Sequence, residues 1–575
     1  MRSTILKITQ AFTLSLIYFP AFAFSQGSTD TADDIIRKQE SERIQEIERI
    51  RQQELDAAYS KRLEAASAEP LIELEKVGPD TPGAFPVDAF VFYTDKQEAL
   101  PRKFYFLKRS VKKLKIKYAN KDSLSGVLAK LTLKLYAKGF VTTRLNLPEQ
   151  DFKDGQVKIE VILGHVDKLL SDDPRVRNSL KIVLPTMERN ILNYRQIENG
   201  IDQIERLNSY TTEFQIAPSA KEGFSDIVCR AKRGKSWAGS VSFDDAYTKL
   251  LGKHTLRGNY SYDNPFGLAD FLSVFTSTAV APPKSVKRYN YGFTYEIPYG
   301  QSLFSANANW NYSSHPIGVN RLSNETESTG YNLDWSILGY RSKYFKSTIG
   351  GTISYYRSYK YLDGNEQRVS RKKTTSLGLR YNATFFFGPS SLNATLSGKI
   401  GVPWFGSQKN ASSMNPKDPT YEYKILNLNV VYTTRGKFFK TIPYNWTTVF
   451  NGQHTDDILY SAEQFSIGSR YTVRGFGNDY TISGETGFFV RNELAFPFRS
   501  LRGVSPTLYF GIDYGEVSGF SDILNKYSEL SGAFVGLRVR WKNLSGNFTW
   551  AEPISGGGSR KLLGDRFSFN VSYRL

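Results

Sequence analysis

The chain has 575 residues, a formal net charge of +19 and 14% aromatic residues, including 35 Tyr and 39 Phe. It is too long for one ordinary soluble domain, and beyond the N-terminus no apolar run approaches the ~20 residues of a membrane helix. The basic charge comes without a recognisable nucleic-acid-binding module, so we expect no nucleic-acid partner. The aromatic content and the mean hydropathy of −0.40 are compatible with a membrane β-barrel, whose strands alternate apolar and polar residues.

Residues 1–25 have the pattern of a secretory signal peptide. Arg2 and Lys7 make a short basic region, residues 11–22 are mostly apolar, and Ala23 is a small residue near the expected cleavage site. This order is typical of a segment that is removed after export, so we expect the mature protein to lie outside the cytoplasm.

Residues 33–66 are rich in Glu, Arg, Gln and Ala and contain no Gly or Pro, which predicts a helix. Pairs such as Glu40 and Arg43, three residues apart, support it. Its apolar stripe is thin, so it cannot bury much surface against a soluble core. We expect this polar helix to plug a water-filled lumen, and a free solvated helix is the alternative. Residues 67–83 contain several Pro and Gly and predict a linker.

Residues 84–169 predict a first small α/β domain. Residues 89–93 are expected to form a strand, and apolar residues at helical spacing predict a helix over 124–135. Two further strands are expected at 140–147 and 157–166, the second after a turn that contains Gly155.

Residues 170–233 repeat this pattern and predict a second domain of the same kind. Asn193 is placed to cap a helix whose apolar face runs from Ile197 to Leu207. Strands are expected near 212–216 and 226–231.

Residues 234–575 predict a transmembrane β-barrel. In segments such as 304–312 and 567–575, every second residue is apolar or aromatic, and polar residues lie between them. A strand with one face toward lipid and the other toward a wet lumen has this pattern. At about 21 residues per strand with its connection, the region has room for about 16 strands, with about 14 and about 18 as the alternatives. A soluble β-sandwich is the alternative. The expected fold class is therefore membrane all-β, with two small α/β domains and a plug helix before the barrel.

Residues suited to catalysis are scattered. The four histidines, His165, His254, His315 and His454, form no H-E-x-x-H pattern, and the single Cys229 excludes an internal disulfide. Metal-ligand spacing, a nucleophile elbow and a phosphate-binding loop are all missing. We expect no enzyme, no cofactor and no metal, although outer-membrane enzymes can assemble a site from distant loop residues.

Two short motifs lie in the predicted barrel. The first is Val473-Arg474-Gly475-Phe476, between two predicted strands, and the second is Gly511-Ile512-Asp513-Tyr514-Gly515. Blocks at 139–150 and 263–270 precede them in the chain. In this order, the motifs make the chain resemble the TpsB-type outer-membrane transporters of two-partner secretion, which include the haemolysin and filamentous-haemagglutinin exporters.

The resemblance implies that the two small domains are POTRA domains and that the first motif lies in a loop folded into the lumen. Arg474 is then expected to form an ion pair with Asp513, because a guanidinium presents a planar fork to a carboxylate. Gly475 is expected to allow a tight turn, and Phe476 to pack against the inner wall.

The resemblance also implies a function. The protein is expected in the Gram-negative outer membrane, with its POTRA domains in the periplasm, where it would export a large TpsA-type exoprotein through the barrel without nucleotide hydrolysis. This exoprotein would be an adhesin, a cytolysin or a toxin. Outer-membrane lipid, lipopolysaccharide and, during biogenesis, the barrel-assembly machinery are further expected partners. Passive porin activity is a third interpretation, as a side activity of the same pore. The alternative function is that of a barrel-assembly factor of the same superfamily, which usually carries more POTRA domains.

The unfolded exoprotein is expected to bind the first POTRA domain. An extended segment can add to an exposed strand edge by β-augmentation. The predicted groove lies between the helix and the following strand, and its residues are Leu124, Leu128, Leu131, Phe140, Val141, Thr142, Thr143 and Arg144.

Overall fold

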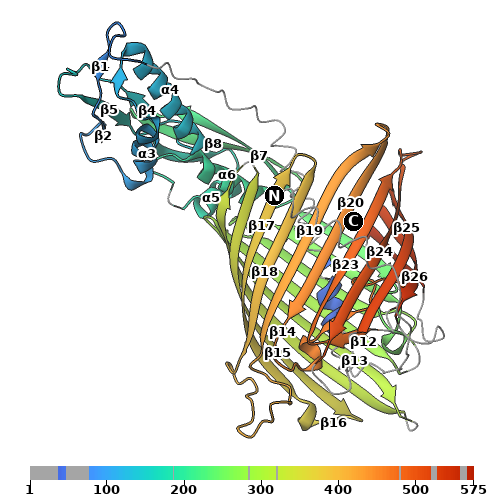
Figure 1. The fold of residues 1–575 in the computed structure, drawn as a ribbon. Coiled ribbons are helices and arrows are strands. Elements are labelled where there is room, and N and C mark those ends of the chain that lie inside the picture. The colour runs from blue at the N-terminus through green and yellow to red at the C-terminus, as the bar shows by residue number, and fades with distance from the viewer. Residues whose placement is uncertain are drawn as a thin grey trace.

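The computed structural model describes residues 37–43, 45, 46, 77–185, 187–282, 285–318, 321–342, 344–477, 481–519, 528–556 and 566–575. The predicted signal peptide, most of the predicted helix 33–66 and the first part of the linker lie outside these residues. Two α/β domains stand in a row at one end of a large β-barrel (Figure 1). No helix in the described residues is long and apolar enough to cross a membrane.

The first domain has a three-stranded sheet with the order β2-β5-β4 and two helices. Helix α4 buries Leu124, Val127, Leu131 and Leu135, as its apolar spacing predicts. The elements are β1 (Phe85–Pro86), β2 (Ala89–Thr94), η1 (Arg102–Phe104), α3 (Tyr105–Leu114), β3 (Tyr118–Ala119), α4 (Lys121–Ala137), β4 (Arg144–Asn146) and β5 (Gln156–Ile162).

Two of the predicted strands in this domain are wrong in extent. The strand expected at 140–147 is reduced to β4, because residues 140–143 form a turn in which Phe140 and Thr143 are buried. The strand expected at 157–166 is two strands, since the chain turns at Gly164. A Cβ on Gly164 would lie 2.1 Å from Thr142 Oγ1, so this close approach requires glycine.

The second domain therefore begins near residue 165 rather than at 170. Its sheet has the order β6-β8-β7, with β6 parallel to β8, and its helix α6 is capped by the Asn193 side chain, as expected. Cys229 is fully buried on β8, and burial raises the pKa of its thiol to about 12. The elements are β6 (His165–Ser171), α5 (Pro174–Val183), α6 (Tyr194–Glu205), β7 (Tyr210–Pro218) and β8 (Phe224–Arg233).

The barrel is closed and antiparallel, with sixteen spanning strands in the described residues. Strand β16 is a two-residue extension of the hairpin between β15 and β17. The last strand pairs with the first over five residue pairs, from Asn570 with Asp244 to Arg574 with Ser240. The strands are β9 (Trp237–Asp244), β10 (Thr255–Asp263), β11 (Phe271–Ala279), β12 (Lys287–Tyr299), β13 (Ser302–Ile317), β14 (Leu322–Arg341), β15 (Phe345–Leu362), β16 (Asn365–Glu366), β17 (Lys372–Phe387), β18 (Ser390–Val402), β19 (Lys424–Phe438), β20 (Ile442–His454), β23 (Thr486–Pro497), β24 (Val504–Ser518), β25 (Ser528–Trp541), β26 (Leu544–Ser555) and β27 (Phe567–Arg574).

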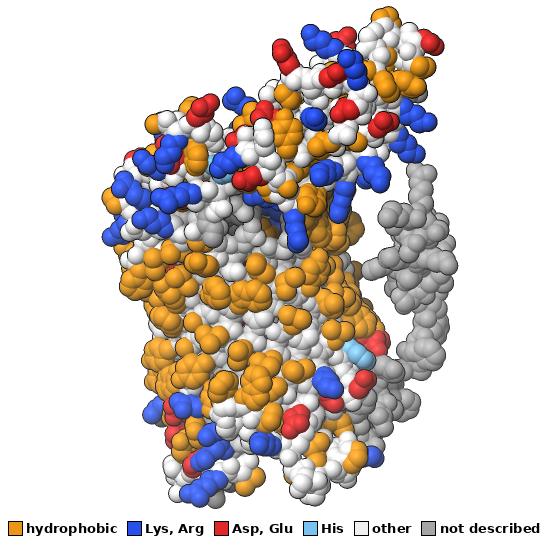
Figure 2. Space-filling model, turned by 90° about the vertical axis from the view of Figure 1, so that its left-hand side faces the viewer, with side chains coloured by type: hydrophobic (Ala, Val, Ile, Leu, Met, Phe, Trp, Pro, Cys, Tyr) orange, Lys and Arg blue, Asp and Glu red, His pale blue; other side chains and the backbone are white. Residues whose placement is uncertain are grey.

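An apolar band surrounds the outside of the barrel. Large apolar side chains such as Leu333 and Leu379 are more than half exposed on this surface. Figure 2 shows the band across the middle of the barrel wall, with Lys and Arg side chains gathered above and below it. This arrangement is the expected outcome of strands that turn alternate residues toward lipid.

The second domain is fastened to one half of the barrel rim. Arg206, the residue that follows its helix α6, forms an ion pair with Glu296 of β12, and Asp202 on the helix pairs with Arg341 of β14. The Ser209 backbone N–H donates to the Asp263 carboxylate at the end of β10 (2.8 Å). These contacts hold the domain against the turns that follow β10, β12 and β14.

Candidate functional site in the barrel lumen

The loop between β20 and β23, here called the lumen loop (described residues 455–477 and 481–485), folds back into the barrel. It contains η4 (Ser461–Glu463) and the short hairpin of β21 (Phe465–Ile467) and β22 (Ile482–Gly484). The loop is held by apolar packing against the inner wall. The buried residues of this cluster are Val431, Val449, Ile467, Val473, Phe476, Phe489, Val517 and Leu530.

Arg474 is the polar anchor of the lumen loop, and it forms the ion pair expected with Asp513 of β24. Its Nε donates to Asp513 Oδ2 (2.6 Å) and its Nη2 to Oδ1 (2.8 Å), so the contact is bidentate. The backbone N–H of Arg474 also donates to Oδ2 (3.1 Å). The guanidinium carbon lies 3.3 Å from the centroid of the Phe534 ring, and Nη1 is 3.4 Å from Glu493. Asp513 is fully buried, so the pair is shielded from water.

Glycines let the loop backbone reach the wall. Gly475 has φ +111°, and a Cβ there would lie 2.8 Å from the backbone of Glu552. A Cβ on Gly515 would lie 2.9 Å from Val473 Cγ2, and one on Gly532 would lie 1.9 Å from the Arg474 carbonyl oxygen. The G-x-D-x-G strand therefore supplies the carboxylate and also the space into which the loop packs.

Three partners of Arg474 were missed by the sequence reasoning. Phe534 and Gly532 lie on β25, which pairs Gly532 with Asp513, while Glu493 lies on β23. One signal was available. Phe534, like Leu530, is a large apolar residue on the lumen-facing side of a strand whose opposite side carries Val535, Leu537 and Val539, and this marks a packing site inside the barrel.

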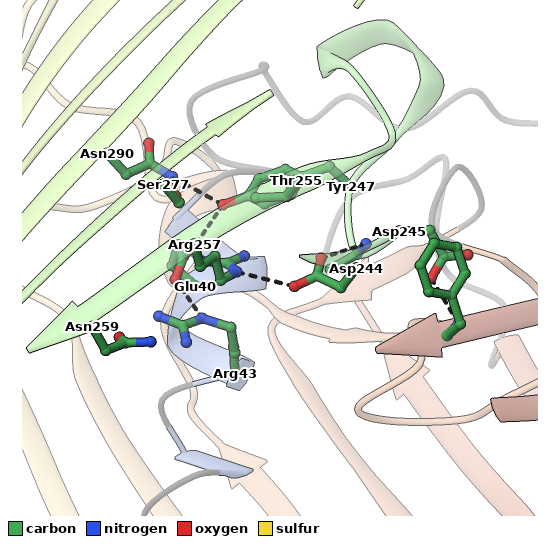
Figure 3. A network of polar contacts seen from close by, with 12 residues as sticks. Glu40, Arg43, Asp244, Asp245, Tyr247, Thr255, Arg257, Asn259, Ser277 and Asn290 are labelled. Carbon is green, nitrogen blue, oxygen red and sulfur yellow. Dashed lines mark hydrogen bonds and ion pairs between the residues drawn. The ribbon is translucent and has the colours of Figure 1, made fainter. Parts of the chain in front are cut away.

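A short helical segment also lies inside the barrel. Its described residues, 37–43, 45 and 46, are called the lumen helix. Glu40 accepts from Arg257 Nη1 of β10 (2.8 Å) and from the Tyr247 hydroxyl, and Arg43 Nε lies 2.8 Å from its second oxygen. Arg257 Nε is also 3.2 Å from Asp244 of β9. Figure 3 shows Arg257 between the two carboxylates.

The lumen helix touches the lumen loop through polar side chains. Arg37 forms an ion pair with Glu463 (2.8 Å), and its guanidinium lies over the Tyr356 ring at 4.5 Å. Lys38 donates to Ser483 (3.0 Å), and Ser469 donates to Glu42 (2.6 Å). The helix is thus joined to the wall and to the loop by charged and hydroxyl groups.

An open cavity of about 680 Å³ remains beside these segments. Its wall is rich in arginine, and carboxylates lie between the arginines. The charged residues that line it are Arg43, Glu46, Asp244, Arg257, Arg435, Arg470, Arg474, Arg491, Glu493 and Arg538. Within the described residues, no group of three or more His, Cys, Asp or Glu is arranged to hold a metal ion.

The residues predicted to bind the exoprotein do not form one exposed groove. Leu124, Leu131, Phe140 and Thr143 are buried, and Leu128 packs against the same core. Val141 packs against the core of the second domain. Thr142 is half-buried against Gly164, and Arg144 alone of the set is exposed, on the short edge strand β4. Apolar spacing identifies a core face correctly, but it does not show whether that face is open.

A closed membrane barrel with two small α/β domains before it and a loop packed in its lumen defines an outer-membrane transporter of the POTRA-plus-barrel class. Residues 223–539 match the family described as haemolysin secretion/activation protein ShlB/FhaC/HecB. Residues 92–164 match the ShlB-type POTRA domain, and residues 165–218 match a POTRA domain. The chain belongs to this haemolysin secretion/activation family, and the resemblance to TpsB-type transporters is confirmed. Its POTRA domains accordingly lie in the periplasm.

Relatives and solved structures agree with this assignment. The chain is 28% identical over 475 residues to the outer membrane transporter CdiB-2 of Burkholderia pseudomallei, covering 82% of this chain and 80% of that protein. It is 27% identical over 411 residues to the hemolysin transporter protein ShlB of Serratia marcescens, covering 69% and 70%. The structure of CdiB from Escherichia coli superposes with a TM-score of 0.81 at 26% identity, covering 96% of this chain and 100% of that one.

Proposed function

We propose that the protein exports an unfolded exoprotein from the periplasm through its barrel, and that the lumen helix is a removable plug. The observation that carries this proposal is the chemistry of the helix contacts. The described residues of the lumen helix are joined to the wall and the loop by ion pairs and hydroxyl groups, which hydrogen bonds to water and to a passing polypeptide can replace.

The entry point proposed for the exoprotein is strand β7 of the second POTRA domain. It is an edge strand of nine residues, the longest edge in the two small sheets. The opposite edge, β6, is covered, because Val166 N–H donates to Asn190 and Arg189 N–H donates to Val166. On the outer side of β7, the Thr212 N–H donates to the Glu205 side chain (3.3 Å). An extended segment that displaces this side chain would add to the sheet beside the barrel rim.

The cargo is proposed to be a large secreted protein, because the Serratia marcescens relative is named a hemolysin transporter. Export is proposed to need no nucleotide, since the sequence holds no phosphate-binding loop. Folding of the exoprotein outside the cell would then make its movement directional.

The decisive experiment compares the host with and without this gene. Loss of one large protein from the culture medium, restored by complementation, supports export. Depletion of other outer-membrane barrel proteins with an unchanged medium would instead assign the chain as a barrel-assembly factor. The exoprotein so identified, diluted from urea onto proteoliposomes that contain the full chain, is expected to enter them without nucleotide.

A photo-crosslinking residue tests the proposed entry point. Placed at Glu213, which is exposed on β7, it is expected to trap the exoprotein during secretion. The same residue at Lys158, exposed on the central strand β5 of the first domain, is the matched control. Equal trapping at both positions would show that β7 is not the recognition edge.

A further inference from the structure

Three neighbouring periplasmic turns carry a concentration of basic and apolar residues. They connect β19 to β20, β23 to β24 and β25 to β26, and these hairpins are adjacent because β20 pairs with β23 and β24 with β25. All the basic side chains in the turns are exposed to solvent. We call this surface the basic collar, and its residues are Lys437, Phe438, Phe439, Lys440, Phe498, Arg499, Leu501, Arg502, Arg540, Trp541 and Lys542.

The collar holds positive charge without a neutralising carboxylate. The segments 435–446, 496–508 and 538–548 contain no Asp or Glu. Among the described residues, no ion pair involves a basic side chain of the collar. The apolar members are strongly exposed, with Phe439 at 89% and Leu501 at 74%. In water, both the repulsion between the positive charges and the exposure of the apolar side chains are unfavourable.

The backbone of the collar has a left-handed conformation at one basic residue in each of its three turns. Lys440, Arg502 and Lys542 have φ values of +65°, +50° and +49°, in the left-handed region that favours glycine and asparagine. Each of the three turns therefore places a basic residue at a position where a glycine would cost less.

The other half of the same rim has a different composition. The ends of β10 and β12 carry Asp263 and Glu296, which hold the second POTRA domain beside the turns that follow these strands. Gly300, in the turn after β12, has φ +59° and donates its N–H to the Ile182 carbonyl of that domain (2.9 Å). One half of the rim thus contacts the second POTRA domain, whereas the collar lies at the height of the periplasmic surface of the membrane.

We propose that the basic collar binds the phosphate groups of anionic phospholipids in the periplasmic leaflet. Phe439, Leu501 and Trp541 would insert at the interface, where aromatic residues of barrels gather, while Lys440, Arg502 and Lys542 would contact the phosphates. The collar continues the apolar band of the barrel wall, so a lipid can fill the band with its tails and the collar with its headgroup. A passing polypeptide would touch the collar only at its lumen edge.

Native mass spectrometry of the full chain tests this proposal. The protein is released from bilayers that contain equal amounts of phosphatidylglycerol and phosphatidylethanolamine, and the retained lipids are counted. We expect preferential retention of phosphatidylglycerol and a loss of about tenfold in that preference for the triple variant K440N/R502N/K542N. Asparagine tolerates the left-handed conformation, so these substitutions remove charge while relieving the backbone.

The matched control is R321N/R368N/K409N, which removes three exposed basic residues from the opposite, extracellular rim. Arg321 also has a positive φ, of +52°. The control is expected to keep the preference for phosphatidylglycerol. An equal effect of both triple variants, or no preference in the parent protein, overturns the proposal. Displacement of the lipid by millimolar inorganic phosphate would also overturn it and would indicate a site for free anions. Reduced secretion by the collar variant with unchanged lipid retention would overturn it as well and would indicate contact with the exoprotein.

Discussion

The lumen loop and the lumen helix occupy the same space but are held there by different forces. The loop buries Val473 and Phe476 completely and closes a bidentate ion pair around Asp513. The helix is held mainly by charged side chains such as Glu40, and its partner Arg257 also forms an ion pair with Asp244. Both segments have buried ion pairs, but the loop adds apolar packing, which favours a permanent position, while polar contacts that a wet lumen can replace favour a reversible one. We infer that the loop is part of the wall and that the helix is the part that moves.

The largest expected effect comes from removing the carboxylate of the loop anchor. Asp513→Ala leaves the buried Arg474 guanidinium without its bidentate partner, which costs about 3–5 kcal/mol. We expect the loop to lose its position and secretion per transporter in the outer membrane to fall steeply. Exoprotein in the medium, divided by transporter in the membrane, is the measurement.

The double variant Asp513→Ala/Arg474→Ala provides the control for this anchor. It should lose less than the sum of the single variants, because the double variant removes both charges, whereas each single variant leaves one of them without its partner. Strictly additive losses would mean that the two side chains do not act together. The inference that the lumen loop is held more firmly than the lumen helix would then be wrong.

A smaller effect is expected from crowding the loop. Gly532→Ala places a Cβ where the Arg474 carbonyl now lies, so the loop must shift, at about 1–3 kcal/mol. Gly398→Ala, on strand β18, is the matched control because a Cβ there meets no atom within 4 Å. Protease cleavage within the lumen loop of intact cells should rise for the first variant alone. Equal cleavage of both would show that the loop is not tightly packed.

The smallest expected effect concerns the helix. Glu40→Gln keeps the shape of the side chain but removes the charge that faces Arg257 and Arg43, while Arg257 retains Asp244. We expect the open fraction in planar bilayers to rise about fivefold, equivalent to about 1 kcal/mol, with normal barrel assembly.

Gln45→Ala, at an exposed position of the same helix, is the control for that measurement and should leave the open fraction unchanged. If Glu40→Gln also leaves it unchanged, the helix is not held by its charges, and the proposed difference from the loop is wrong.

The sequence was most informative where a pattern is local or a motif is specific. Alternation along strands such as β13 and β27 predicts the barrel, and two short motifs predict the contact between Arg474 and Asp513. Helix α3 was missed, because its buried Leu107 and Val111 are separated by basic residues that suggest only a solvated surface.

The contacts between the lumen helix and the barrel wall had no sequence signal. Glu40 and Arg257 are 217 residues apart, and nothing near either residue indicates the other. Most residues predicted to line a groove on the first POTRA domain lie in its core for a related reason. A row of apolar residues shows that a face is covered, but the covering element, here the core of the same domain, is settled only by the tertiary structure.

Strand β10 links two of the features described above in mechanical terms. Its last residue, Asp263, receives the hydrogen bond from Ser209 of the second POTRA domain, and Arg257 on the same strand receives the lumen helix through Glu40. Six residues, or about 20 Å of extended chain, separate the two contacts, and both side chains lie on the same face of the strand. A strand resists stretching along its axis. A force on the domain that tilts β10 therefore also moves Arg257, the residue that binds the lumen helix. The second POTRA domain and the lumen helix are therefore coupled through the same strand, so movement of the domain on cargo binding would be transmitted to the helix.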